Sequence, residues 1–191
     1  MFRDLVLKCR SYRRFYQDVA LDKGTLRELV DLARCSASAL NRQPLKYIIS
    51  CSGENNALIF SCLHWAAALK DWKGPVEGER PSAYIVILGD KGISTTFNID
   101  PGIAAQTILL GAVEKEFGGC MLGSAEKDKL RQLINIQDKY EILLVIALGK
   151  PREKVIMETM EPTDSFNYWR DNDSVHHVPK RKLDDIIVTQ L

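Results

Sequence analysis

The sequence predicts one α+β domain over residues 1–191. Segments with helical spacing alternate with short segments of β-branched and aliphatic residues. No internal repeat, low-complexity tract or linker divides the chain. A chain of 191 residues can bury roughly 70% of its unfolded surface around one core. Its hydrophobic fraction of 46% and charged fraction of 27% indicate an ordinary globular protein.

Five segments carry apolar residues at helical spacing. Asp22 is placed to cap the second, and Ser124 to cap the fifth. Asp100 followed by Pro101 marks the start of the fourth, because a short polar cap and a first-turn proline favour a helix N-terminus. The expected helices cover residues 2–9, 22–33, 55–72, 103–117 and 125–134.

Three segments predict strands, namely 45–51, 83–88 and 141–148. The nearly continuous apolar sequence of 83–88 is typical of a central strand that is covered on both faces. Glycine and proline predict a loop over 73–81. After Pro151 no period persists, so no element is predicted until the tail. That tail needs a surface to cover, on this subunit or a second one, because it carries Leu183, Ile186, Ile187 and Val188.

Charge and cysteine content restrict the possible partners and compartment. The net charge of +1 provides no general attraction to nucleic acid or an anionic bilayer. The five cysteines are an odd count without CxxC spacing, which indicates reduced thiols rather than disulfides or a zinc site. The start of the chain lacks a signal-peptide core, and no apolar run approaches the roughly 18 residues of a membrane span. We therefore expect a cytoplasmic protein with no nucleic-acid or membrane partner.

The sequence offers no catalytic machinery of its own. It contains no GxSxG, HExxH, P-loop or GxGxxG motif, and no carboxylate pair stands out. His64 and the adjacent pair His176 and His177 lack the spacing of metal ligands, so no metal is predicted. Cys120 has no evident base and is interpreted as a structural or cofactor-lining residue. No catalytic residue is assigned, and a bound cofactor is expected to supply the chemistry.

Three separate segments suggest what that cofactor is. Residues 8–15 combine cations with a serine hydroxyl, 38–44 place polar amides before a proline, and 118–123 form a glycine-flanked apolar turn. Together they suit an anionic, planar, partly apolar ligand. Flavin mononucleotide (FMN) has that anatomy, with a phosphate at one end and a ring with a hydrogen-bonding edge at the other.

With these motifs the chain resembles the FMN-dependent nitroreductase family, from Arg10 to about Ile187. Residues 10–13 are similar to its Arg-Ser-x-Arg/Lys signature, and 38–44 to its Pro-Ser-x-x-Asn-x-Gln-Pro segment. Residues 119–123 correspond to its Gly-x-x-x-Gly turn, and Lys180-Arg181-x-Leu183-Asp184-Asp185-Ile186 to its basic C-terminal motif. Cys9 stands where many relatives have arginine and Ala37 where proline is usual, which removes one expected phosphate contact and loosens one loop.

The resemblance implies a role for each matching residue. Arg10 and Ser11, with Lys180 and Arg181 from the far end of the chain, are expected to hold the phosphate by charge-assisted hydrogen bonds. Arg13 is expected at the N1/O2 edge of the flavin ring.

The remaining matches are expected around the ring and the ribityl chain. The polar edge would face side chains contributed partly by the other subunit, namely Ser38, Asn41 and Gln43. Backbone groups near the reactive centre would come from Met121, Leu122 and Gly123. The implied fold is nitroreductase-like α+β, a central mixed β-sheet flanked by helices, with the C-terminal arm exchanged in a homodimer.

The implied activity is ping-pong hydride transfer. NADH or NADPH would reduce the flavin at N5, and a small electron acceptor such as a nitroaromatic or quinone would then reoxidise it. One alternative is a flavin-binding protein of the same fold with a specialised role, as a flavin-modifying enzyme, dehalogenase or sensor. A second is a nucleic-acid patch made by residues 10–14 and 180–182; the low net charge and the lack of interleaved aromatics argue against it.

Overall fold

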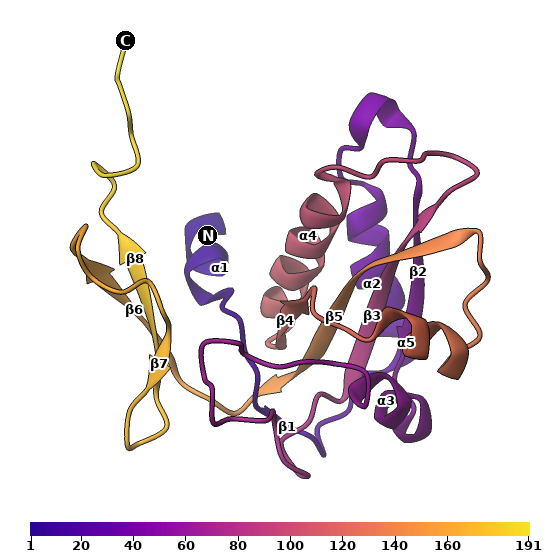
Figure 1. The fold of residues 1–191 in the computed structure, drawn as a ribbon, viewed down its shortest axis with the longest axis horizontal. Helices are drawn as coiled ribbons and strands as arrows, with labels where there is room; N and C mark the ends of the chain where they lie inside the picture. Colours follow the sequence, from indigo (N-terminus) through magenta and orange to yellow (C-terminus); the bar gives the residue numbers. More distant parts are fainter.

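The computed structural model describes all residues, 1–191. Its strands form a larger and a smaller sheet, and Figure 1 shows the smaller one beside the N-terminal helix. The larger sheet has five strands: β1 (Phe15–Tyr16), β5 (Tyr140–Pro151), β3 (Ala83–Asp90) and β2 (Leu45–Ser50) in that order, with β4 (Gly118–Leu122) also paired to β5. The three strands predicted from the sequence are thus confirmed as β2, β3 and β5.

The long strand β5 organises the larger sheet. One of its edges pairs with β3 and the other with β4, and its last two residues pair with β1. All four ladders of this sheet are antiparallel. The one parallel contact at its margin is an isolated bridge between Ser11 and Gly119.

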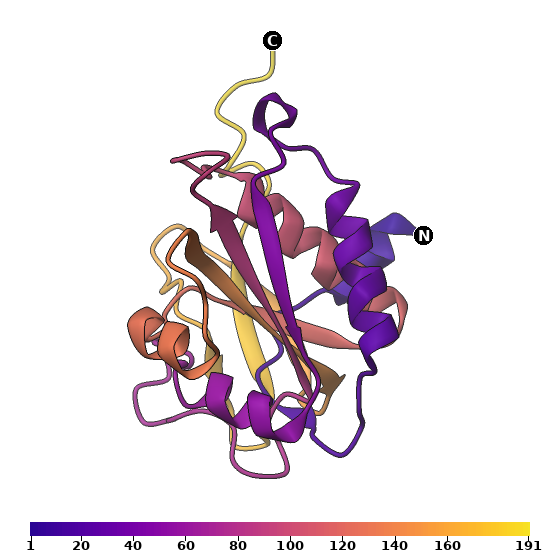
Figure 2. The ribbon, with the colours of Figure 1, turned by 90° about the vertical axis from the view of Figure 1, so that its right-hand side faces the viewer.

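Both faces of the larger sheet are covered. Because side chains alternate along a strand, Ala83, Ile85 and Ile87 of β3 face one way and Tyr84, Val86 and Leu88 face the other. The first face packs against α2 (Lys23–Arg34) and α4 (Asp100–Glu114). The second packs against α3 (Gly53–Phe60), the segment after it, and α5 (Lys127–Leu133). Figure 2 shows α2 and α4 on one side of the long strands and α5 on the opposite side.

The smaller sheet has the order β6 (Val155–Met160), β8 (His176–Arg181), β7 (Trp169–Arg170). Here the pairing is mixed, since β6 and β8 run parallel while β7 and β8 run antiparallel. None of these strands was predicted, because their side chains do not alternate between apolar and polar. They lie near α1 (Phe2–Lys8), and the exposed C-terminal tail continues from β8 away from both sheets (Figure 1).

Helix boundaries are where the sequence predictions were least accurate. The cap at Asp22 is confirmed, since its Oδ1 accepts from the Thr25 N–H at 2.8 Å. The helix expected over 55–72 is wrong beyond Phe60, where α3 ends. The chain turns there because the Trp65 ring packs between Phe60 and Trp72, with centroid separations of 5.8 and 6.5 Å, and Ala66 adopts a positive φ of 43°.

Two further helices begin elsewhere than predicted. Helix α4 starts at Asp100 itself, with Ile99 as its cap, because the Asp100 carboxylate is used by another loop. Helix α5 starts after Glu126, not Ser124. The predicted Gly-x-x-x-Gly turn is not a turn, because its first four residues belong to strand β4. None of the helices combines the length and the apolar character needed to cross a bilayer.

Candidate functional site

The N-terminal motif is attached to strand β4 through the backbone. Ser11 forms the parallel bridge with Gly119, and the Tyr12 N–H donates to the Gly119 carbonyl at 3.0 Å. This places the Ser11 hydroxyl, which is exposed, beside the start of β4. Two of the segments selected from the sequence are therefore adjacent in space.

The approach of these backbones depends on Gly119. A Cβ at this position would lie 2.1 Å from the Ala147 carbonyl oxygen of β5. No side chain fits at that separation, so only glycine allows β4 to pair with β5 while carrying the N-terminal motif. By contrast, a Cβ on Gly123 would have no atom within 4 Å, so the end of β4 is open.

The side chains of β4 are divided between core and surface. Leu122 is buried in the core, Met121 is partly exposed, and Cys120 is buried. Burial raises the pKa of Cys120 to about 12, although the Arg13 cation opposes the change. The thiol is therefore protonated at neutral pH and packs as a small apolar group, which excludes a thiolate nucleophile here.

Arg10 joins the N-terminal helix to the smaller sheet. Its Nη2 donates to the Val6 carbonyl at the end of α1 at 2.7 Å, and Nη1 contacts the Met157 sulfur of β6. Its Nε is buried without a partner. In the ladder between β6 and β8, Met157 pairs with Val178, close to Lys180 and Arg181. Arg10 thus lies next to the strand that carries the C-terminal basic pair.

Lys180 and Arg181 end β8, and both side chains are exposed and form no hydrogen bond or ion pair. The end of the molecule that holds Arg10 and Ser11 therefore has cations with unused donors. This donor set suits a phosphate group, which accepts several charge-assisted hydrogen bonds at once.

Arg13 is fixed at its backbone and carries an uncompensated charge. Its N–H donates to the carboxylate of Glu153, whose side chain is fully buried. Its guanidinium lies 4.6 Å from the Tyr168 ring centroid, and Nη1 is 3.2 Å from His176 Nε2. No carboxylate pairs with this guanidinium, and its Nε and Nη2 make no hydrogen bond.

His176 stays uncharged beside Arg13. Burial, and then the cations of Arg13 and Arg170, lower its pKa to about 4. The neutral ring can accept from Arg13 at Nε2, while its Nδ1 is buried without a partner. Sequence reasoning missed Glu153, Tyr168 and His176 as supports of Arg13, because they follow Pro151, where no period is visible.

The second polar segment is organised by Asp100. Ser38 Oγ donates to Asp100 Oδ2 at 2.7 Å and accepts from the Gln43 N–H at 3.0 Å, while the Ala39 N–H donates to Asp100 Oδ1 at 3.0 Å. Gln43 Nε2 also donates to Asn41 Oδ1 at 3.2 Å. The loop is strained, with φ values of 52°, 53° and 52° at Leu40, Asn41 and Gln43.

The two groups of predicted residues lie at opposite ends of the larger sheet. Pro44 precedes β2, whose first residue pairs with Gly89, and Gly89 pairs with Glu141 of β5. Gly118, next to the N-terminal motif, pairs with Gly149 at the other end of β5. At about 3.3 Å per residue, the stretch of β5 between Glu141 and Gly149 measures roughly 25 Å. One chain therefore brings Arg10, Ser11, Arg13 and β4 together but leaves Ser38, Asn41 and Gln43 apart.

No cluster of three or more histidine, cysteine, aspartate or glutamate side chains in this chain has the arrangement of a metal site.

The chain is similar to known proteins over the region that carries three of the four predicted motifs. The model of the Nitroreductase family matches residues 6–150, which include the N-terminal motif, the Ser38 loop and β4. Among curated proteins, "Putative NAD(P)H nitroreductase YodC" of Bacillus subtilis (strain 168) is 22% identical over 195 residues, covering 86% of this chain and 96% of that protein.

Solved structures share the fold at low identity. A nitroreductase family protein from Streptococcus pneumoniae TIGR4 matches with a TM-score of 0.68 and 16% identity over 100% of both chains. A nitroreductase in complex with FMN from Exiguobacterium sibiricum 255-15 matches with a TM-score of 0.65 and 20% identity, covering 80% of this chain and 89% of that one. An FMN-dependent nitroreductase from Clostridium difficile R20291 matches with a TM-score of 0.63 and 22% identity, covering 78% and 87%. The chain belongs to the nitroreductase family, and its fold is the nitroreductase-like α+β fold.

Proposed function

We propose that residues 1–191 form one FMN-binding domain that transfers hydride from NADH or NADPH to a small electron acceptor, such as a nitroaromatic or quinone. The observation that carries the proposal is the backbone attachment of the cationic Ser11 motif to β4 through Gly119. The donor set at this end fits a flavin phosphate. Bound FMN would supply the redox chemistry, taking two electrons from the nicotinamide and giving them to the acceptor.

In this proposal the phosphate is held by four residues from both ends of the chain. Arg10, Ser11, Lys180 and Arg181 would provide the donors. Lys180 and Arg181 are unpaired, and Arg10, whose Nη atoms contact Val6 and Met157, has no carboxylate to neutralise its charge. The backbone of Met121, Leu122 and Gly123 would lie along the ring, where the open space at Gly123 leaves room.

Binding of FMN is the first test. The purified protein should absorb near the flavin maximum, and flavin-free protein should regain FMN on titration. Ser11→Ala combined with Arg181→Gln should weaken FMN binding by about tenfold or more, because two hydrogen bonds to a charged group are lost. A matched control is Ser61→Ala with Arg34→Gln, in exposed positions on other elements. Equal affinities in the two double variants would contradict the phosphate assignment.

Arg13 is proposed to tune the flavin. Reduction places negative charge at the N1/O2 edge, and the Arg13 cation has no carboxylate partner to neutralise it. Arg13→Ala should lower the two-electron potential by tens of millivolts, at about 30 mV for each 1.4 kcal/mol. Potentiometry of the flavin checks this against Arg13→Lys, which retains the charge. Equal potentials in wild type and Arg13→Ala would remove Arg13 from this role.

A homodimer is proposed because the predicted site is divided within one chain. A second subunit can bring its Ser38, Asn41 and Gln43 to the Arg10 end, which one subunit cannot do across roughly 25 Å. The tail also exposes apolar side chains that need cover, namely Leu183, Ile186, Ile187 and Val188. Light scattering of the full chain should give twice the monomer mass, and deletion of residues 183–191 should weaken both dimerisation and FMN binding. A monomer that binds FMN with full affinity would contradict the shared site.

Anaerobic mixing with each nicotinamide then separates an oxidoreductase from a passive flavin binder. Rapid bleaching by NADH or NADPH, followed by reoxidation with a quinone or nitroaromatic, is the expected result. A flavin that neither nicotinamide reduces would favour the specialised role.

A further inference from the structure

The guanidinium of Arg13 has one nitrogen that is fully bonded and an edge that is free. Nη1 donates to the Ser11 carbonyl at 3.3 Å and lies 3.2 Å from His176 Nε2, so both of its N–H groups have partners. Nε and Nη2 have no partner, and neither atom is buried, in contrast to the unpartnered Nε of Arg10. Together Nε and Nη2 form a rigid fork that fits two acceptors side by side. This edge of Arg13 is therefore a two-donor group within reach of a ligand.

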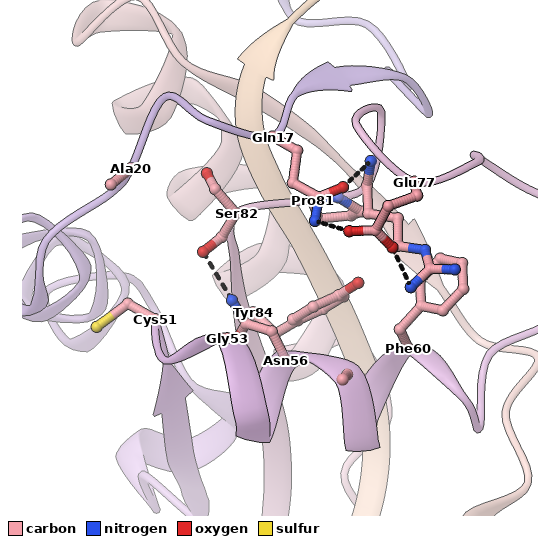
Figure 3. A pocket seen from close by; sticks show the side chains of 12 residues that line it. Gln17, Ala20, Cys51, Gly53, Asn56, Phe60, Glu77, Pro81, Ser82 and Tyr84 are labelled. Carbon is pink, nitrogen blue, oxygen red and sulfur yellow. Dashed lines mark hydrogen bonds and ion pairs between the residues drawn. The ribbon is translucent and has the colours of Figure 1, made fainter.

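The cavity at the start of β3 has no comparable group (Figure 3). It encloses about 390 Å³, and the amides of Gln17 and Asn56 in its wall are bonded to the loops around them. The wall atoms without partners, among them Tyr84 Oη and Ser82 Oγ, are buried and lie beyond the reach of a ligand. The fork of Arg13 differs because it is both free and accessible.

His176 contacts Arg13 as an acceptor. A guanidinium has only donors, so the ring Nε2 accepts and the ring proton is on Nδ1. The side chain is completely buried in β8, the middle strand of the smaller sheet, and its backbone N–H donates to the Lys154 carbonyl at 2.8 Å. Burial lowers the pKa of His176 to about 4, and the cations of Arg13 and Arg170 act in the same direction, so the acceptor is present at neutral pH.

Tyr168 covers one face of the same guanidinium. The ring centroid lies 4.6 Å from Arg13 Cζ, within the range of a cation over an aromatic face. The ring in turn packs on His176 with centroids 5.2 Å apart, and its Oη accepts from the Ala68 N–H at 3.4 Å. A ring against the plane and an acceptor at one nitrogen fix both the tilt and the rotation of the guanidinium. Both residues follow position 150, where the match to the family model ends.

We propose that Tyr168 and His176 are positioning residues of the flavin site, which hold Arg13 so that its Nε and Nη2 donate together to N1 and O2 of FMN. This rests on the proposed function, because it requires FMN at the Arg13 end of the molecule. N1 and O2 are neighbouring acceptors that gain negative charge on reduction, so two aligned donors favour the reduced form more than a mobile cation does. Tyr168 and His176 act on the flavin only through Arg13.

The two-electron potential of bound FMN tests the role of Tyr168. Tyr168→Leu should weaken binding of reduced FMN relative to oxidised FMN about fivefold, which lowers the potential by about 20 mV at about 30 mV for each factor of ten. Tyr168→Phe keeps the ring, and Trp169→Leu removes a neighbouring ring that stacks on His177 instead, so both should keep the wild-type potential. A wild-type potential in Tyr168→Leu, or an equal shift in Trp169→Leu, would overturn the proposal.

Two replacements of His176 separate its acceptor from its volume. His176→Phe fills the site without an acceptor and should lower the potential as Tyr168→Leu does, whereas His176→Gln places an amide oxygen near the position of Nε2 and should restore most of it. In an Arg13→Ala background neither His176→Phe nor Tyr168→Leu should change the potential further, because residues that act through one partner are not additive. Additive shifts would show that they do not act through Arg13.

Nitrogen-15 NMR of the arginine side chains in flavin-free protein separates this proposal from the proposed function. A guanidinium held at Nη1 rotates slowly, so the wild type should give separate Nη1 and Nη2 signals for Arg13, which Arg13→Lys identifies by their absence. Tyr168→Leu and His176→Phe should merge the two signals, and Trp169→Leu should not. Merged signals in the wild type would mean that Arg13 is not held. Separate signals in a protein that takes up no FMN would leave Arg13 held while the proposed function, and the flavin contact with it, failed.

Discussion

The two sheets of this molecule are held together by different forces. In the larger sheet, β3 is buried on both faces and its side chains pack against helices on each side. In the smaller sheet, ion pairs and ring contacts dominate: Arg170 pairs with Glu153 at 2.8 Å, and His177 stacks on Trp169 with centroids 4.0 Å apart. The first sheet is specified by a hydrophobic pattern and the second by individual polar partners. The smaller sheet supports Arg13, so the candidate site depends on the sheet with fewer apolar contacts.

The largest expected effect is in the larger sheet, at Gly119. Gly119→Ala places a methyl group against the Ala147 carbonyl, so β4 must separate from β5. We expect a loss of roughly 5 kcal/mol or failure to fold, which urea unfolding would measure. Gly123→Ala, where a Cβ meets nothing, is the control. Similar stabilities of the two variants would show that β4 is not held as described.

Glu153→Gln tests the contact between the two sheets. The buried carboxylate accepts from the Arg14 N–H at 3.3 Å as well as from Arg13 and Arg170, and its loss leaves Arg170 buried and unpaired. The expected cost is about 3–4 kcal/mol. Glu116→Gln removes an exposed pair with Lys150 and should cost less than about 1 kcal/mol. Hydrogen exchange should rise in β8 before β3, and uniform exchange in both would contradict the division into two sheets.

The smaller sheet should have a stability maximum near pH 6.5. His176 has its pKa lowered from 6.5 to about 4, mainly by burial, so its contribution is present above pH 6.5 and is lost as pH falls toward 4. Between pH 6.5 and pH 4, the acid limb of the stability curve, the free energy of unfolding should fall by about 2–3 kcal/mol. His177 has its pKa raised by hydrogen bonds to Glu158 and Asp171, so its contribution is present below pH 6.5 and is lost as pH rises through the raised value.

Urea unfolding between pH 4 and pH 9 measures the acid limb, below the ordinary histidine pKa of 6.5, and the alkaline limb above it. His176→Phe should flatten the acid limb only, and His177→Gln the alkaline limb only. A single variant that flattened both would show that the two histidines titrate as one unit.

The smallest expected effect is at the far end of the larger sheet. Ser38→Ala removes hydrogen bonds to Asp100 and from Gln43 and should cost about 1 kcal/mol. The effect on FMN affinity should be larger than the effect on stability if the Gln43 amide contacts the flavin. Ser36→Ala, in the turn after α2, removes the hydrogen bond to Thr107 of α4 and is the control.

The sequence predicted the three longest strands of the larger sheet, β2, β3 and β5, because they carry a strong apolar signal, as over 83–88, but it missed β1 and took β4 for a turn. It failed beyond Phe60, where the packing of Trp65 with Trp72 competes with helical spacing in a way that no local pattern reveals. It also failed in β6 and β8, whose residues do not alternate between apolar and polar. The ion pair beside these strands, between Glu153 and Arg170, joins residues that are distant in the sequence, so no local pattern reveals it.

The candidate site was predicted in part. The attachment of Ser11 to Gly119 is consistent with the selection of both segments, but the sequence did not reveal that their contact is through the backbone. The role of Asp100 was missed, since Asp followed by Pro is also the usual start of a helix and gives no sign of a contact with Ser38.

Since Ser11 is tied to β4 by main-chain atoms, the pre-formed end of the candidate site should survive removal of its ligand. Uptake of FMN by the stripped protein should then proceed in one kinetic phase, without a slow rearrangement, and flavin analogues with altered rings should be exchangeable by simple dialysis. A slow second phase in stopped-flow fluorescence would show that this end of the chain reorganises during reconstitution.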